Sequence, residues 1–189
     1  MWKSICRNMR RSYILILLLV AVLVVGGVFY LEYHHRQELS KVQNACIILI
    51  SKQEMKLRLI DYKGQEIFCA PVATGKNVGD KRKQGDMRTP EGVFQVSDIQ
   101  RATDWKHDFG DGKGEIDGAY GDFFIRLLVP GHKGIGIHGT HLPESIGTRA
   151  SEGCIRMYNE DLKKLVSLIY PPLTVVVTPG IEDEAANHL

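Results

Sequence analysis

Apolar and polar residues alternate most regularly in residues 55–61, MKLRLID, which have the two-residue period of a half-buried β-strand. Other short runs of β-branched, aromatic and aliphatic residues, bounded by turn-forming residues, predict further strands. These runs are residues 46–51, 66–74, 92–99, 123–129, 135–138 and 173–179. The first three strands follow one another closely, so we expect them to form a meander, and we expect residues 123–138 to form a hairpin.

One segment has a helical period instead. Apolar residues recur every three or four positions from Leu162 to Ile169, which places them on one face of a helix. We expect Asn159 to cap the N-terminus of this helix and Pro171 to end it.

Residues 13–31, YILILLLVAVLVVGGVFYL, are uncharged and mostly apolar. As a helix they would span roughly 28 Å, about the thickness of the hydrocarbon core of a bilayer. Residues 1–12 contain four basic residues and no acidic one. The positive-inside rule then predicts a single-pass anchor in the cytoplasmic membrane, with the N-terminus inside and the body periplasmic or otherwise extracytoplasmic. A cleaved signal peptide is the alternative that the same residues leave open.

These patterns divide the chain into five parts. Residues 1–12 are a cytoplasmic basic segment, residues 13–31 the transmembrane anchor, and residues 32–44 a polar tether. Residues 45–180 are a mainly β domain with one or two short helices, and residues 181–189 are a polar tail. A domain of this length can enclose a hydrophobic core without disulfides or metals.

The net charge of +2 depends on the N-terminal segment, because the rest of the chain has 20 basic and 22 acidic residues. A nearly neutral body argues against nucleic acid as the main partner.

The basic residues at 75–91 are interpreted as a solvated loop, with contact to an anionic polymer as the alternative. The Gly- and Asp-rich residues 104–122 lack the spacing of an EF-hand calcium loop. A segment of that length often lines a site, where it can act as a lid.

Three of the four cysteines follow the anchor, so at least one exported thiol has no partner within the chain. Cys46 and Cys69 lie in the first and third strands of the expected meander. Two strand spacings put them roughly 9–10 Å apart, which is too far for a disulfide. We therefore expect both to be buried free thiols.

Cys154 has a chemical partner in His138, which lies in GIGIHGT with fifteen residues between the two. A thiol alone has a pKa near ~8.5, and a nearby imidazole can take its proton to leave the reactive thiolate. The imidazole then needs an acceptor on its other nitrogen, and the carbonyl of Gly139 is close in sequence. A zinc site made by His138, His141 and Cys154 is the alternative, although structural zinc usually has four ligands.

The residues around the thiol add to this chemistry. Gly153 allows a tight turn, so the N–H groups of Gly153 and Cys154 can face the oxygen of an attacked carbonyl. Loss of one such donor typically costs ~3–4 kcal/mol of transition-state stabilisation. Arg156 favours a thiolate or binds a substrate carboxylate, with a surface ion pair as the plainer interpretation.

The paired segments IHGT, at 137–140, and SEGCIRM, at 151–157, resemble the YkuD-type L,D-transpeptidases, which are bacterial thiol acyltransferases of peptidoglycan. VATGK, at 72–76, and TPEGVF, at 89–94, are similar to further segments of that family. The resemblance covers roughly residues 45–178. It implies an L,D-transpeptidase-like β-sandwich or barrel.

The resemblance also implies roles for the matching residues. Cys154 would be the nucleophile, His138 the base and then the acid, and the carbonyl of Gly139 the group that orients His138. The N–H groups of Gly153 and Cys154 would form the oxyanion hole.

The substrate site would be shaped by Ser151, Arg156 and Thr140. One departure from the family is Glu152, at a position where many members have a histidine. It raises the question of whether a carboxylate there alters the choice of acceptor.

The implied reaction is a two-step acyl transfer on peptidoglycan stem peptides, without a metal or other cofactor. The thiolate attacks the L,D-peptide bond before the terminal D-residue of a stem tetrapeptide, D-alanine leaves, and a thioester forms. An amine of another stem, or of an attached protein, then takes the acyl group. An L,D-carboxypeptidase or amidase would use the same residues, and an inactive wall-binding module is the alternative of another class. A carbapenem-type inhibitor is expected to acylate Cys154.

Overall fold

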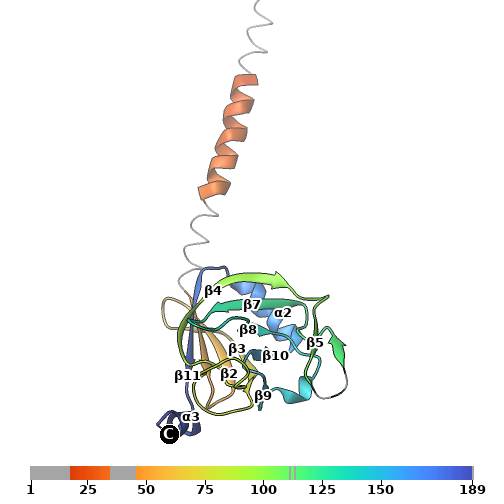
Figure 1. Ribbon diagram of the computed structural model, residues 1–189. Coiled ribbons are helices and arrows are strands. Elements are labelled where there is room, and N and C mark those ends of the chain that lie inside the picture. The colour runs from red at the N-terminus through yellow and green to blue at the C-terminus, as the bar shows by residue number, and fades with distance from the viewer. Residues whose placement is uncertain (1–17, 35–45, 111, 113, 189) are drawn as a thin grey trace, which may run out of the picture. The chain divides into compact units, whose positions relative to one another are not determined.

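The computed structural model, drawn in Figure 1, describes residues 18–34, 46–110, 112 and 114–188. Its contacts divide the chain into two units, Met1–Lys41 and Val42–Leu189, and each is described by itself.

In the first unit, residues 18–34 form a helix with exposed side chains. This helix includes residues 18–31 of the predicted anchor. Across the residues that the structure describes, no helix is both long enough and apolar enough to cross a membrane. The rest of the predicted anchor, the basic segment 1–12 and tether residues 35–44 lie outside the described residues.

The second unit consists mainly of short strands, so the predicted fold class is confirmed for this unit. The strands are β1 (Ile47–Ser51), β2 (Lys56–Ile60), β3 (Glu66–Gly75), β4 (Gly92–Arg101), β5 (Lys106–Asp108), β6 (Glu115–Asp117), β7 (Phe123–Leu128), β8 (Gly136–His138), β9 (Arg149–Ser151), β10 (Ile155–Met157) and β11 (Leu173–Thr178). The helices are the 3-10 helix η1 (Pro143–Ser145) and the α-helices α2 (Asn159–Leu168) and α3 (Ile181–Asn187).

Nine of the described strands form one sheet, in the order β10-β8-β7-β4-β11-β1-β2-β3-β9. A further pairing of β10 with β3 closes this sheet into a barrel, around which the strands curve in Figure 1. The antiparallel pairs β1–β2 and β2–β3 form the expected meander, and β7–β8 forms the expected hairpin. In contrast, β8 and β10 pair in parallel, which joins the two segments that carry the candidate site.

Alternate side chains of each strand point into the barrel, because successive residues of a strand face opposite sides of the sheet. These inward side chains form the hydrophobic core. The buried residues of β1, β2 and β11 are Ile48, Ile50, Leu57, Leu59, Leu173, Val175 and Val177. Helix α2 adds Leu162 and Leu165 to the same cluster. The predicted apolar stripe of this helix is therefore its buried face.

The prediction that Asn159 caps α2 is wrong. Tyr158 occupies the N-cap position and makes no capping hydrogen bond with its side chain. The Asn159 amide instead binds the backbone of Thr140, accepting from its N–H at 2.8 Å and donating to its carbonyl at 3.2 Å. A long-range contact, which local sequence does not reveal, replaces the local cap.

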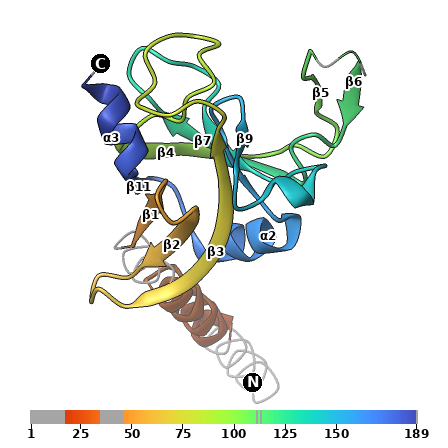
Figure 2. The ribbon, with the colours of Figure 1, turned by 90° about the horizontal axis from the view of Figure 1, so that it is seen from below.

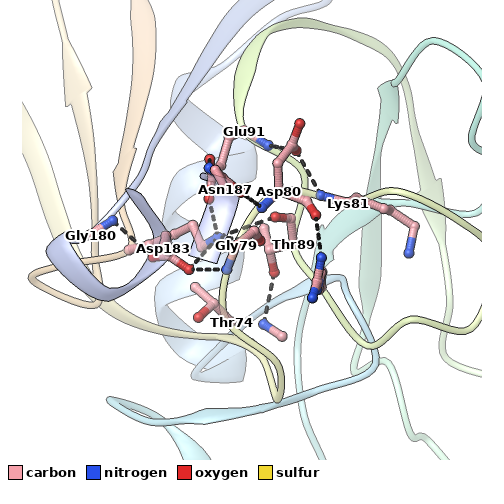
Figure 3. Close-up of polar contacts among 12 residues, drawn as sticks. Thr74, Gly79, Asp80, Lys81, Thr89, Glu91, Gly180, Asp183 and Asn187 are labelled. Carbon is pink, nitrogen blue, oxygen red and sulfur yellow. Dashed lines mark hydrogen bonds and ion pairs between the residues drawn. The ribbon is translucent and has the colours of Figure 1, made fainter. Parts of the chain in front are cut away.

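The segment predicted as a polar tail contains the helix α3, which is tied to the barrel by Asp183. The side chain of Asp183 is fully buried. It accepts a hydrogen bond from the N–H of Gly79 at 2.7 Å, as Figure 3 shows, and lies 2.8 Å from Lys52 Nζ and 2.7 Å from Arg149 Nη2. The polar composition of residues 181–189 did not predict this helix. The helix is held against the barrel by the buried charge of Asp183 and not by an apolar face.

Cys46 and Cys69 are both free, and β2 lies between β1 and β3 as expected. The prediction of a buried thiol is confirmed for Cys46 and wrong for Cys69, which is exposed. Cys69 lies opposite Arg58 of β2, in the half of β3 whose residues are mostly exposed.

Candidate active site

The parallel pairing of β8 with β10 brings the candidate residues to one face of the sheet. Its register pairs Ile137 with Ile155 and His138 with Arg156. Cys154 precedes β10 and stands two residues before Arg156, and side chains two residues apart point to the same side of an extended chain. The sequence motifs therefore meet through strand pairing.

A pocket of about 210 Å³ opens over this face. Its walls come from the basic loop between β3 and β4, the β5–β6 hairpin, the β7–β8 turn and the segment before β10. Residues that line it include Lys81, His107, Phe109, Tyr120, Lys133, His138, Ser151, Glu152, Cys154 and Arg156. Figure 2 shows β5 and β6 as a hairpin that stands apart from the closed sheet. Three residues of the segment expected to line the site, His107, Phe109 and Tyr120, do line the pocket.

His138 is held in the orientation that a base requires. Its Nδ1 lies 2.7 Å from the carbonyl oxygen of Gly139, which can only accept a hydrogen bond. Nδ1 therefore carries the proton, and Nε2 keeps its lone pair. The ring stacks on Phe124, with centroids 5.6 Å apart, and Tyr120 meets it edge-on at 4.8 Å. Burial lowers the pKa of His138 to about 3, against the opposing effect of the Gly139 hydrogen bond.

Cys154 has a free thiol, half-buried at the wall of the pocket. Its S–H donates to the carbonyl of Gly134 at 3.2 Å. Burial raises the pKa of the thiol to about 11, although Arg156 and Lys81 act in the opposite direction. These shifts favour the neutral thiol and the neutral imidazole at rest.

The turn before the thiol differs from the expected oxyanion hole in one respect. The N–H of Gly153 donates to Ser151 Oγ at 3.1 Å, and Ser151 Oγ in turn donates to the carbonyl of Cys154. Gly153 N–H is thus occupied, while the N–H of Cys154 has no hydrogen-bond partner within the described ranges. Ser151, expected at the substrate, is almost fully buried and holds the turn in shape.

Arg156 lies in the pocket and not in a surface ion pair. Its side chain is buried, its guanidinium lies over the ring of Phe109 at 5.1 Å, and its Nε has no hydrogen-bond partner within the described part of the chain. A guanidinium that lines a pocket is suited to an anionic group of a ligand.

Thr140 was expected to contact substrate, but it is buried and does not line the pocket. Its Oγ1 accepts from the N–H of Leu142 at 2.9 Å, and its backbone binds Asn159. Thr140 therefore fixes the loop after His138. In the part of the chain that the structure describes, no group of three His, Cys, Asp or Glu residues could hold a metal.

A family model described as the L,D-transpeptidase catalytic domain, YkuD, matches residues 46–177. The chain belongs to this family. The resemblance found from the paired motifs is thereby confirmed, and the match covers the described barrel up to β11.

The relatives of this YkuD domain include two Bacillus proteins. YkuD of Bacillus licheniformis is 40% identical over 132 residues, which are 70% of this chain and 65% of that protein. YqjB of Bacillus subtilis is 32% identical over 147 residues, which are 75% of this chain and 77% of that protein.

Solved structures share the fold. The helical cell shape determining protein Pgp2 from Campylobacter jejuni aligns with a TM-score of 0.53 and 27% identity, over 72% of this chain and 48% of Pgp2. L,D-transpeptidase 3 from Mycobacterium tuberculosis, in complex with a faropenem-derived adduct, aligns with a TM-score of 0.53 and 18% identity, over 71% of this chain and 60% of that protein. At that identity the similarity concerns the fold alone.

The basic loop of the YkuD domain, interpreted from sequence as solvated, is partly built into the site. Lys81 is buried, and its Nζ lies 2.7 Å from Asp86 Oδ1. Thr89, from the same loop, accepts from the N–H of Gly75 at 2.8 Å and donates to the carbonyl of Gly153 at 3.0 Å. The TPEGVF segment thus supports the turn that carries the thiol, a role that sequence reasoning missed.

Replacing Thr89 with valine is expected to destabilise the domain by roughly 2–4 kcal/mol, because it leaves a buried N–H and a buried carbonyl without partners. Urea unfolding of the full chain measures this loss. Thr103→Val, at an exposed position whose hydroxyl makes no described hydrogen bond, is the matched control and should change stability little. Equal stability of the two variants would contradict the role of Thr89.

Acid is expected to destabilise the domain partly through His138. The ring binds a proton near pH 6.5 when unfolded but only near pH 3 when folded. Above the unfolded pKa of 6.5, the neutral ring makes its full contribution to the free energy of unfolding. This contribution is lost as pH falls toward the folded pKa of about 3, by at most about 1.4 kcal/mol per pH unit. Urea unfolding between about pH 7 and about pH 5 should show a shallower pH dependence in His138→Gln than in the unchanged chain. Parallel pH profiles would rule the effect out.

Proposed function

We propose that the chain is a peptidoglycan L,D-transpeptidase that transfers the acyl group of a stem tetrapeptide through a thioester on Cys154. The observation that carries this proposal is the meeting of His138, Cys154 and Arg156 in one pocket. The sulfur is free and the imidazole has its Nε2 lone pair available. Membership of the YkuD family supports the same chemistry.

In the first step, the sulfur attacks the carbonyl carbon of the L,D-peptide bond while His138 Nε2 takes the thiol proton. The C–S bond forms, and the N–H of Cys154 stabilises the negative oxygen. The C–N bond then breaks, and His138 returns the proton to the departing D-alanine amine. Arg156 suits the terminal carboxylate of the donor, because its guanidinium is a cation that lines the pocket.

In the second step, an amine attacks the thioester carbonyl, a C–N bond forms and the C–S bond breaks. His138 again moves a proton, this time from the attacking nitrogen to the departing sulfur. The hydrogen bond from Nδ1 to the Gly139 carbonyl leaves the Nε2 lone pair of the neutral imidazole available to take a proton in each step.

We also propose that residues 13–31 anchor the domain in the cytoplasmic membrane, with residues 1–12 inside and the barrel outside. The apolar run and the basic segment before it support this placement. It would put the pocket in the compartment that holds peptidoglycan.

Incubation of the full chain with a tetrapeptide muropeptide tests the reaction, with products and acyl-enzyme followed by mass spectrometry. Crosslinked dimer and released D-alanine are expected. Tripeptide without dimer would identify an L,D-carboxypeptidase, because water would then accept the acyl group. The absence of product and of any carbapenem adduct would instead favour an inactive wall-binding module.

A further inference from the structure

Glu152 is the one carboxylate among the described residues that line the active-site pocket. The other charged side chains of the lining are Lys81, Lys133 and Arg156. These cations attract a donor stem, which ends in a carboxylate, but they repel an acceptor that arrives as an ammonium ion. A carboxylate in the same pocket offsets that repulsion.

The side chain of Glu152 is placed to receive a cation. It is 32% exposed and stands two residues before the nucleophile Cys154. Its Oε2 lies 2.9 Å from His107 Nε2, while its Oε1 has no hydrogen-bond partner in the described parts of the chain. One oxygen is therefore held by His107, and the other remains available to a ligand in the pocket that Glu152 lines.

His107 orients this carboxylate from the β5–β6 hairpin. The hydroxyl of Tyr120 lies 3.1 Å from His107 Nδ1, and Phe109 packs on the same ring with centroids 4.4 Å apart. When Tyr120 donates to Nδ1, the neutral ring carries its proton on Nε2 and donates it to Glu152. The hairpin thus holds the carboxylate in one orientation.

We propose that Glu152, oriented by His107, binds the ammonium group of the acyl acceptor and takes one of its protons. This inference rests on the proposed acyl transfer. The ammonium gives a proton to the carboxylate, and the free amine attacks the thioester, forming a C–N bond as the C–S bond breaks. His138 carries the second amine proton to the sulfur, and Glu152 releases the first to solvent.

The contact between Glu152 and His107 also has a simpler interpretation, as a latch that holds the hairpin against the barrel. Loss of a purely structural contact would change the rate of transfer to all acceptors alike. Loss of a carboxylate that binds the acceptor would lower the rate only for a charged acceptor. Glu152→Gln separates the two, since a glutamine carbonyl still accepts from His107 Nε2 but carries no charge. Glu152→Asp restores the charge with a shorter reach.

The experiment compares two acceptors with the same muropeptide donor and the full chain. Nα-acetyl-lysine amide carries a protonated side-chain amine at neutral pH, and hydroxylamine is uncharged. In Glu152→Gln, kcat/KM for the lysine derivative should fall at least about tenfold, with less than about a threefold change for hydroxylamine. Glu152→Asp should recover part of the loss. Glu144→Gln, an exposed carboxylate of η1 outside the pocket, is the control and should leave both acceptors unaffected.

Equal losses for both acceptors, or no loss for either, would overturn the acceptor site and leave the proposed acyl transfer standing. Absence of any acyl-enzyme in the unchanged chain would overturn the proposed function, and the acceptor site with it. A selective loss for the charged acceptor, recovered in part by aspartate, would establish the site.

Discussion

Replacing Cys154 with alanine is expected to lower D-alanine release and dimer formation at least about a thousandfold, because no other group can form the thioester. Within the described lining of the pocket, Cys154 is the one thiol. Single-turnover incubation with muropeptide, followed by intact-protein mass spectrometry, measures both the product and the acyl-enzyme. The carbapenem adduct should disappear together with turnover.

The variant is expected to fold normally, because Cys154 is half-buried and the hydrogen bonds described for its side chain are to the backbone, at Gly134 and Gly136. Cys69→Ala is the matched control, since this thiol is also free but is exposed on β3. It should keep full activity and the adduct. Turnover by Cys154→Ala, or loss of the adduct in Cys69→Ala, would refute the assignment of the nucleophile.

The strands with long apolar or alternating runs were predictable, because burial in a sheet imposes a two-residue period on the sequence. The strands β5, β6, β9 and β10 were not predicted. Each has three residues and, unlike the equally short β8, no preceding apolar segment and turn that predict a hairpin, so each is defined by its partner strand. Closure of the barrel by β10 and β3 was therefore not visible in the sequence.

In the active site too, contacts between residues far apart in the chain could not be predicted from the sequence. His138 and Cys154 were assigned from the chemistry of a thiol beside an imidazole, together with the resemblance of their two segments to the YkuD family. Thr89 was missed, since its hydroxyl bonds to a carbonyl 64 residues away. Ser151 and Thr140 were expected at the substrate from the family resemblance. Ser151 lines the pocket and Thr140 does not, and the hydrogen bonds of both fix the local backbone.

Asp183→Ala is expected to lower the free energy of unfolding by about 3 kcal/mol, because its two cationic partners lose a fully buried carboxylate and keep only the less buried Glu91 and Glu182. Those partners are Lys52 and Arg149, and Lys52 is as deeply buried as Asp183 itself. Burial alone would raise the pKa of Asp183, but the hydrogen bonds from Lys52 and Arg149 hold this pKa well below its usual range. The stability that the carboxylate provides is therefore present above about pH 4 and is lost as pH falls below its usual pKa.

Glu182→Ala is the matched control for this prediction. Glu182 precedes Asp183 on α3, but its side chain is 77% exposed and lies 4.0 Å from Arg149 Nε, so its loss should change stability little. Urea unfolding of both variants, with the full chain as reference, measures the difference. Similar stabilities for the two variants would show that α3 does not depend on the buried ion pairs.

Asp183→Ala should also alter the active site, through the basic loop that Lys52 holds. Lys52 Nζ donates to the carbonyls of Gly79 at 3.0 Å and Thr89 at 3.4 Å, and Figure 3 shows Gly79 and Thr89 close together in the basic loop. The same loop brings Lys81 to the pocket and the Thr89 hydroxyl to the turn before Cys154. Acylation by a carbapenem should therefore be slower in Asp183→Ala, even at temperatures where circular dichroism shows the variant to be folded. An unchanged acylation rate in the folded variant would confine the role of α3 to stability.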